Sequence, residues 1–197
     1  MYIPKAFEVP DVAAMHALMR THPLAALVTL SPSGLEGNHI PMQLSVDGGP
    51  QGLLRGHVAR ANPLLRDLQL LDALVIFQGP QAYVSPGWYP TKAQTGKAVP
   101  TWNYMVVHAH GPLRLVEDQD WLRQQLEALT ATHEAGHAQP WSMQEAPADY
   151  IDTLMKAIVG IEIPITRLEG KWKLSQNQPQ TNREGVIAGM QAITPTP

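Results

Sequence analysis

The stretch VPTWNYMVVHAHGPLRLV, residues 99–116, decides the fold. Its valines and aromatic residues predict one long strand, in which Gly111-Pro112 introduces a bulge or an edge. Turn signals separate it from shorter β patterns, which lie at 24–30, 39–46, 52–58, 73–77, 81–85, 158–168 and 170–174. Because the turns are short, and 81–85 is interpreted as the hairpin partner of 73–77, the strands should form a mainly antiparallel sheet.

Helical patterns flank these strands. The strongest amphipathic pattern covers 118–132, and Ser142–Glu145 matches a capping box before a helix near 149–157. Further helices are predicted at 11–21, after Asn62-Pro63 with Leu64, Leu65 and Leu68 apolar, and near 182–193 behind a capping box at Thr181–Glu184. The expected class is α+β, mainly antiparallel β, a closed or half-closed barrel with peripheral helices. It should form one domain over 1–197 with a helical insertion near 118–157.

Composition limits the functions open to the chain. It has 197 residues and no cysteine, so disulfides, cysteine-based zinc sites, iron–sulfur clusters and thiol nucleophiles are excluded. A formal net charge of −3 gives no broad basic surface for nucleic acid. No apolar run approaches the roughly 20 residues of a membrane span, and residues 1–7 lack the pattern of a signal peptide. We therefore expect a cytoplasmic protein with no membrane partner.

Residues 133–137, HEAGH, match the H-E-x-x-H pattern of zinc hydrolases. That pattern needs two imidazoles on one face of a continuous helix. Gly136 interrupts the helix here, and Pro140 follows. We therefore expect His133 and His137 to lie at a solvated helix end, and we expect no metal there.

Four other histidines could serve a ligand site. His108 and His110 are two residues apart on a predicted strand, so they project from one face and could chelate a metal. His39 and His57 lie on early strands near turns, where each could act as a pocket donor. Each of the four is equally suited to a structural role.

Two clusters combine aromatic and polar side chains. Trp102, Asn103 and Tyr104 begin the long strand and could stack on a planar ring and bond its edge. The segment KWKLSQN, residues 171–177, carries two ammonium groups and could hold an anion such as phosphate. Residues 56–63, GHVARANP, run from a strand into a helix start, where backbone N–H groups favour an anion.

Together these segments resemble the PaiB family, the FMN-binding negative transcriptional regulators. The matching stretches span nearly the whole chain in order: MYIPKAF at 1–7, HIPM at 39–42, GHVARANP at 56–63, FQGPQAYVSPGWYPTK at 77–92, VPTWNY at 99–104, VHAHG at 107–111 and KLSQN at 173–177. The resemblance implies a split β-barrel of Greek-key type, FMN as cofactor, and a homodimer with its flavin sites at the interface.

The resemblance also implies a distribution of roles along the chain. The FMN phosphate is expected at the turn after an early strand, and the isoalloxazine against a strand and the partner subunit. The residues that the resemblance assigns to FMN are His39, Gly56, His57, Arg60, Asn62, Trp102, Asn103, Tyr104, Lys173, Gln176 and Asn177.

Other functions stay open at the level of sequence. A flavin protein of this kind could be a regulator or a flavin-dependent oxidoreductase, and no residue identifies a substrate. The alternative is a repressor that binds DNA directly, for which the helix near 182–193 is the one plausible reader. Lesser alternatives are a haem protein, with His57, His108 or His110 as axial ligand, and a zinc hydrolase through His133 and His137.

Overall fold

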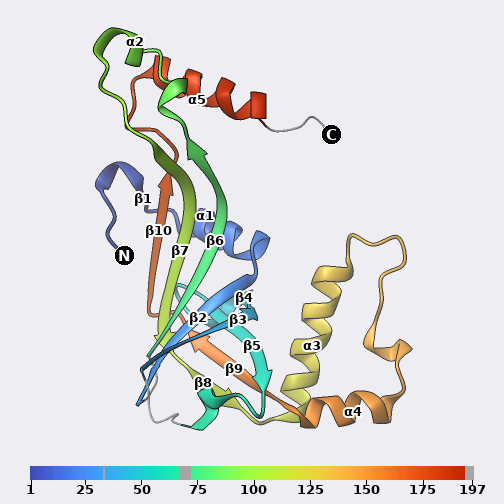
Figure 1. Ribbon diagram of the computed structural model, residues 1–197. Coiled ribbons are helices and arrows are strands. Elements are labelled where there is room, and N and C mark those ends of the chain that lie inside the picture. The colour runs from blue at the N-terminus through green and yellow to red at the C-terminus, as the bar shows by residue number, and fades with distance from the viewer. Residues whose placement is uncertain (33, 67–71, 194–197) are drawn as a thin grey trace. The chain divides into compact units, whose positions relative to one another are not determined.

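A computed structural model describes residues 1–32, 34–66 and 72–193 of the chain (Figure 1). Its helices are α1 (Val12–Thr21), α2 (Lys92–Thr95), α3 (Gln119–Glu134), α4 (Ala148–Lys156) and α5 (Gln180–Ile193), with short 3₁₀ turns η1 (Lys5–Phe7), η2 (Val46–Gly48), η3 (Pro63–Arg66), η4 (Pro86–Trp88) and η5 (Met143–Glu145). Its strands are β1 (Glu8–Val9), β2 (Leu24–Ser31), β3 (Gly34–Pro41), β4 (Gln43–Ser45), β5 (Leu53–Ala59), β6 (Asp72–Val84), β7 (Thr101–Pro112), β8 (Arg114–Val116), β9 (Ile158–Pro164) and β10 (Arg167–Lys173).

The chain divides into two compact units. The first unit takes residues 1–18, 78–107 and 169–197, and the second takes 19–77 and 108–168. The division passes through β6 and β7, so each of these strands contributes to both units. The prediction of one domain over the whole chain stays a prediction.

In the first unit, β1, β10, β7 and β6 are neighbours in that order. Helix α5 lies beside the η4–α2 segment (Figure 1). The helix packs through Val186 and Met190 onto a small core of Val84, Trp88 and Tyr89. Gly185 permits this close approach, because a Cβ there would lie 2.0 Å from the Trp88 carbonyl oxygen.

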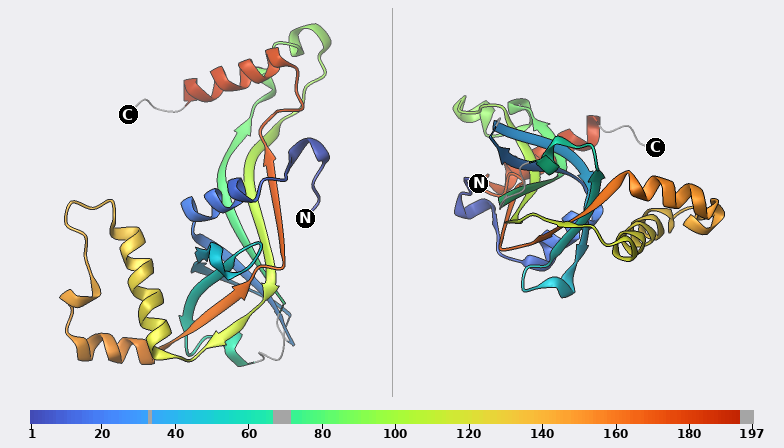
Figure 2. Two further views of the ribbon diagram at one scale, coloured as in Figure 1. Left: turned by 180° about the vertical axis from the view of Figure 1, so that it is seen from behind. Right: turned by 90° about the horizontal axis from the view of Figure 1, so that it is seen from below.

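In the second unit, β6, β2 and β3 are neighbours, and a separate antiparallel sheet has the order β4-β5-β9-β8. Helix α4 meets one end of α3 at a steep angle in the left view of Figure 2, and the two helices share with η5 a core of Leu122, Met143, Ile151 and Met155. The Asp118 side chain caps α3 by accepting from the Trp121 N–H at 2.8 Å. The expected capping box is present, since Glu145 accepts from the Ser142 N–H at 2.9 Å.

Several predicted boundaries are wrong. The hairpin expected at 73–77 and 81–85 is the single strand β6. The pairing of β6 with β2 ends at Ile76, so Pro80 removes no hydrogen bond from that pairing. Gly79, where a turn was expected, instead allows β6 to pack closely against Leu18. The strand expected at 158–168 is two strands, β9 and β10.

The helix start expected at the Thr181–Glu184 box is also wrong. Helix α5 already begins at Gln180, whose side chain bonds Glu184 at 2.8 Å. The long strand ends at Pro112 and resumes as β8, which confirms an interruption at Gly111-Pro112. Leu68 lies outside the described residues.

Among the described residues, no helix combines the length and apolar character needed to cross a lipid bilayer.

Candidate functional site

A cleft of about 290 Å³ opens in the first unit, and we call it the Lys173 cleft. Its lining comes from η1, from the segment between η4 and β7, from the start of β7, from the end of β10 with the loop behind it, and from α5. The lining residues are Phe7, Tyr89, Lys97, Ala98, Val99, Thr101, Lys173, Ser175, Asn177, Gln178 and Asn182. Two lysines line it, and none of these described residues is acidic.

Lys173 is held in place by β7. Its ammonium donates to the Thr101 hydroxyl at 2.6 Å and to the Trp102 carbonyl at 2.7 Å, and it lies 6.0 Å from the centre of the Phe7 ring. Burial lowers the pKa of Lys173, because the neutral amine is easier to desolvate than the ammonium ion. A partly desolvated cation without a carboxylate partner is suited to an anionic ligand.

The loop after β10 carries a strained residue. Ser175 has φ of 63°, a left-handed conformation that residues with a Cβ rarely adopt. Its side chain is only 5% exposed and donates to Asn103 Oδ1 at 3.0 Å, across 72 positions of the chain. Such strain persists where the surrounding structure imposes it, and functional sites are common among such places.

The aromatic cluster on β7 does not form one surface with Asn103. Asn103 is 7% exposed and faces Ser175, whereas Trp102 is 53% exposed, as alternation along a strand requires. Trp102 makes an edge-to-face contact with Tyr83, with 5.8 Å between ring centres. Tyr104 lies 5.3 Å from the buried ammonium of Lys171.

The remaining predicted residues of this unit differ in their placement. Asn177 lines the Lys173 cleft. Gln176 is exposed, and its amide bonds the Leu174 N–H and the Trp172 carbonyl, so it braces its own loop.

In the second unit, the turn after β5 contains Arg60 and Asn62. Arg60 forms a two-bond pair with Glu117, at 2.8 and 3.2 Å, and also donates to the carbonyls of Lys156 and Ile158. Its hydrogen bond with Glu117 raises the pKa of Arg60, and the same bond lowers the pKa of Glu117. Arg60 thus ties β5 to the segments around β8 and β9.

Asn62 shapes the turn itself. Its side chain accepts from the Leu64 N–H at 2.9 Å, at the start of η3, and donates to the Asn38 side chain at 2.8 Å. Gly56 is buried in β5, where a Cβ would lie 3.3 Å from the Pro41 carbonyl. His39 is exposed on β3, opposite Ala26.

His57 lies among residues that the sequence did not identify as candidates for a site. Its Nδ1 lies 3.1 Å from the side-chain oxygen of Gln125 on α3. On the same face of β5, Arg55 Nε donates to Glu162 Oε1 at 3.0 Å. The indole N–H of Trp121 donates to the same oxygen at 3.1 Å. In the sequence, only the alternation of Arg55 and His57 along the predicted strand 52–58 indicated that these two side chains share a face.

The other histidine pairs are placed as their spacing predicted. The His108 and His110 rings share one face of β7, with centres 6.4 Å apart, and His110 Nδ1 contacts Arg167 at 3.0 Å. Helix α3 ends at Glu134, so His133 lies in its last turn and His137 lies beyond it. The HEAGH segment therefore does not present both imidazoles on one helix face.

Comparison with known proteins identifies the family. Residues 1–167 match a family model described as "Putative FMN-binding domain". The uncharacterized protein AN0679 of Emericella nidulans is 36% identical, over 98% of this chain and 91% of its own length. The Bacillus subtilis protease synthase and sporulation protein PAI 2 is 30% identical, over 97% of this chain and 89% of its own length.

Solved structures show the same fold. The FAD and heme binding protein from Mycobacterium smegmatis superposes with a TM-score of 0.61 at 17% identity, covering 92% of this chain and 80% of that chain. With its antiparallel sheets and few, peripheral helices, the molecule has the split-barrel fold of flavoproteins. The chain belongs to the FMN-binding domain family, which confirms the resemblance to PaiB, and its cofactor is FMN.

Proposed function

We propose that this chain works as a homodimeric FMN-binding protein of the PaiB type, in which the flavin has a redox or a regulatory role. The observation that carries the proposal is the Lys173 cleft, which combines two lysines with hydroxyl and amide groups and has no acidic residue among its described lining. Phosphate needs cations and neutral donors, and a carboxylate nearby would repel it.

The residues of the cleft fit the polar part of FMN. Lys173 would hold the phosphate, and Thr101, Ser175 and Asn177 offer further polar contacts. FMN supplies one- and two-electron transfer when it is bound. The predicted contacts of Trp102, Asn103, Tyr104 and Gln176, which lie in the same unit, belong to this proposal. Those of the second unit, His39, Gly56, His57, Arg60 and Asn62, stay a separate prediction from the family resemblance.

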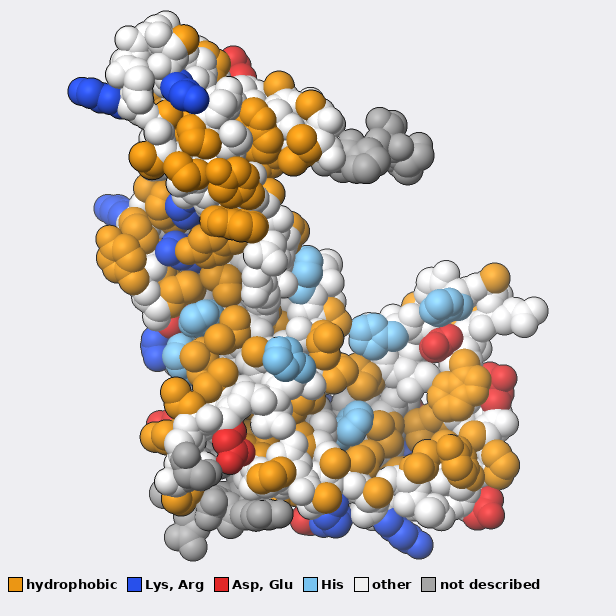
Figure 3. Space-filling model, in the orientation of Figure 1, with side chains coloured by type: hydrophobic (Ala, Val, Ile, Leu, Met, Phe, Trp, Pro, Cys, Tyr) orange, Lys and Arg blue, Asp and Glu red, His pale blue; other side chains and the backbone are white. Residues whose placement is uncertain are grey.

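The exposed aromatic residues of the first unit support the homodimer. Trp102 and Tyr83 meet edge to face, with about half of each residue exposed. On the face drawn in Figure 3, apolar side chains gather around α5 and the strand ends beside it. Exposed aromatic surface of this kind is typical of protein interfaces. A role in regulating transcription and a cytoplasmic location complete the proposal.

Titration of the purified protein with FMN and with riboflavin tests the proposal. We expect saturable FMN binding with a flavin absorption spectrum, and at least tenfold weaker binding of riboflavin, which lacks the phosphate. Equal affinities for FMN and riboflavin would show that the protein makes no contact with the phosphate. The absence of saturable binding of either flavin would contradict the proposed function. Light scattering with size-exclusion chromatography measures the expected dimer.

A second measurement separates the two roles of the flavin. Reduction of the bound flavin by NADH or NADPH, followed in the visible spectrum, would favour the redox role. Retained binding without reduction by either donor would favour the regulatory role.

A further inference from the structure

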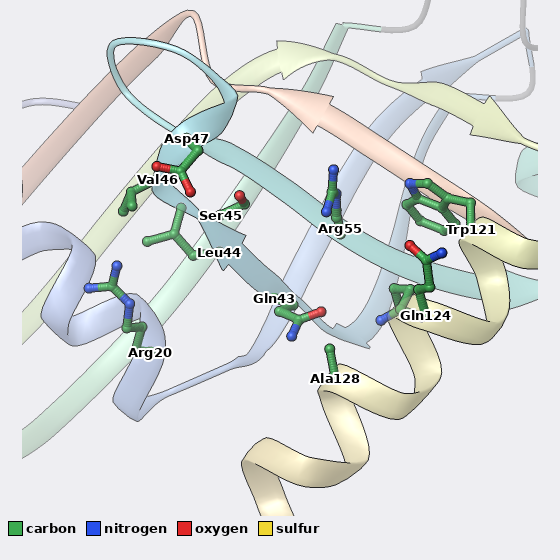
Figure 4. A pocket seen from close by; sticks show the side chains of 11 residues that line it. Arg20, Gln43, Leu44, Ser45, Val46, Asp47, Arg55, Trp121, Gln124 and Ala128 are labelled. Atoms are coloured by element: carbon green, nitrogen blue, oxygen red, sulfur yellow. The ribbon is translucent and has the colours of Figure 1, made fainter. Parts of the chain in front are cut away.

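A cavity in the second unit lies between α3 and the strands β4 and β5, and we call it the α3 pocket (Figure 4). Its volume is about 470 Å³, enough for a small ring compound with one or two substituents. The lining residues are Arg20, Gln43, Leu44, Ser45, Val46, Asp47, Arg55, Trp121, Gln124, Gln125 and Ala128.

One carboxylate positions a cation and an aromatic ring at this pocket. Glu162 Oε1 accepts from both Arg55 Nε and Trp121 Nε1, and the Arg55 guanidinium lies 5.8 Å from the indole centre. Gly160 makes room for the indole, because a Cβ there would lie 2.3 Å from the ring. Only Nε of Arg55 is bonded among the described residues, so its two terminal nitrogens can bind a ligand.

A second cation stands at the pocket. Arg20, at the end of α1, makes no ion pair or hydrogen bond with the described residues, and Figure 4 shows it on the side of the pocket opposite Trp121. Its guanidinium can bind a carboxylate or a phosphate through paired N–H donors.

A buried amide also lacks a partner. Gln125 is 3% exposed, and while its oxygen contacts His57, its Nε2 has no hydrogen-bond partner among the described residues. An unpaired buried amide group is costly, so its persistence in a pocket wall points to a ligand acceptor.

Asp47 limits the charge of the ligand. Arg55 is already paired with Glu162, so Arg20 and Asp47 are the lining charges left without an ion pair among the described residues, and a ligand with one anionic group is favoured over a more highly charged one. We propose that the α3 pocket binds a planar aromatic small molecule with a single carboxylate or phosphate group. Arg20 holds the anion, and the ring of the ligand lies toward Trp121 and Arg55. This inference goes beyond FMN binding, since it assigns a second ligand to the protein.

Calorimetric titration of the full-length protein, saturated with FMN, tests the proposal with three probes. Benzoate and phenyl phosphate carry the anion, and the tighter of the two identifies the preferred group. Benzyl alcohol is the neutral comparison and should bind at least tenfold more weakly. The double variant Arg20→Gln, Arg55→Gln should lose at least tenfold in affinity for the anionic probe, whereas Arg183→Gln, an exposed arginine of α5 in the first unit, should lose nothing.

A blocking variant covers the case in which the double variant unfolds. Ala128→Trp, at an exposed lining position of α3, should fill the pocket and abolish probe binding without removing a hydrogen bond. Probe binding that persists in the folded variants, or its absence in the wild type, would overturn the proposal. FMN affinity should be unchanged in all of them. If FMN affinity falls together with probe affinity, the pocket is the flavin's own, which overturns the second ligand and leaves FMN binding intact.

Discussion

Lys173 is the residue on which FMN affinity should depend most. Lys173→Ala removes one charge-assisted contact, worth about 1.5–3 kcal/mol, so the dissociation constant for FMN should rise by about tenfold or more. Lys92→Ala, an exposed lysine of α2 that does not line the cleft, is the matched control. Fluorescence titration of both variants with FMN decides whether Lys173 belongs to the site. A dissociation constant of Lys173→Ala equal to that of the wild type would show that Lys173 does not contact FMN.

The same residue makes a prediction for pH. Burial lowers the pKa of Lys173, and only the ammonium form attracts phosphate. FMN affinity should therefore be full well below that lowered pKa and should fall as the pH rises through it, before an ordinary lysine would lose its proton. Lys173→Ala should flatten this alkaline decline, and a decline that is unchanged in the variant would assign it to another group.

Ser175 combines an unfavourable backbone with a favourable buried bond, and two substitutions separate the two effects. Ser175→Ala keeps the strain and leaves Asn103 Oδ1 without its partner, so unfolding should require about 1–3 kcal/mol less. Ser175→Gly also loses the bond but relieves a strain of about 1–2 kcal/mol, so it should be the more stable variant. Urea denaturation measures both, and an alanine variant as stable as wild type would show that the buried bond contributes nothing.

At the scale of elements, the docking of α5 depends on glycine. Gly→Ala in an exposed helix normally stabilises by about 0.5–1 kcal/mol. Gly185→Ala should instead destabilise by about 1–3 kcal/mol, because the new Cβ would lie 2.0 Å from the Trp88 carbonyl. Gly136→Ala, in the turn after α3, is the control for the steric effect, because a Cβ there would meet no atom within 4 Å apart from its chain neighbours. Thermal denaturation tests this, and stabilisation by Gly185→Ala would mean that the helix is not docked in solution.

A prediction about metal binding concerns the two histidines at the end of α3. His133→Ala and His137→Ala should leave metal content and any activity unchanged, since the helix ends at Glu134, between the two histidines. Elemental analysis of both variants against wild type is the measurement. Loss of stoichiometric zinc in either variant would favour the hydrolase instead.

At the scale of the whole molecule, charge bears on DNA binding. The formal net charge is −3, and tight binders normally neutralise several phosphates. Helix α5 offers exposed Arg183 and Gln191, while Val186 and Met190 are committed to packing. We expect no nanomolar, competitor-resistant binding to DNA from upstream of the protein's own gene near physiological salt, as measured by anisotropy. Such binding, lost in Arg183→Ala, would restore the repressor as the primary function.

Local sequence alone determined those features in which neighbours along the chain set the outcome. Asp118 caps α3, the Ser142–Glu145 box precedes α4, and the glycine of HEAGH follows the end of a helix, as predicted. The α+β class followed from short turns between β patterns, and the motifs of the PaiB family indicated FMN before any geometry was known. Each of these rests on interactions within a few residues or on the order of short motifs along the chain.

Only the tertiary structure decided which distant side chains meet. Ser175 bonds Asn103 across 72 positions, and Glu162 joins Arg55 to Trp121 although it lies 107 and 41 positions away. The same holds for β6, whose Gly79-Pro80 resembles a turn locally but fits a continuous strand. Periodicity in the sequence predicts which face of a helix or strand a side chain occupies. It does not predict which residue that side chain contacts, because the contact depends on how the elements pack together.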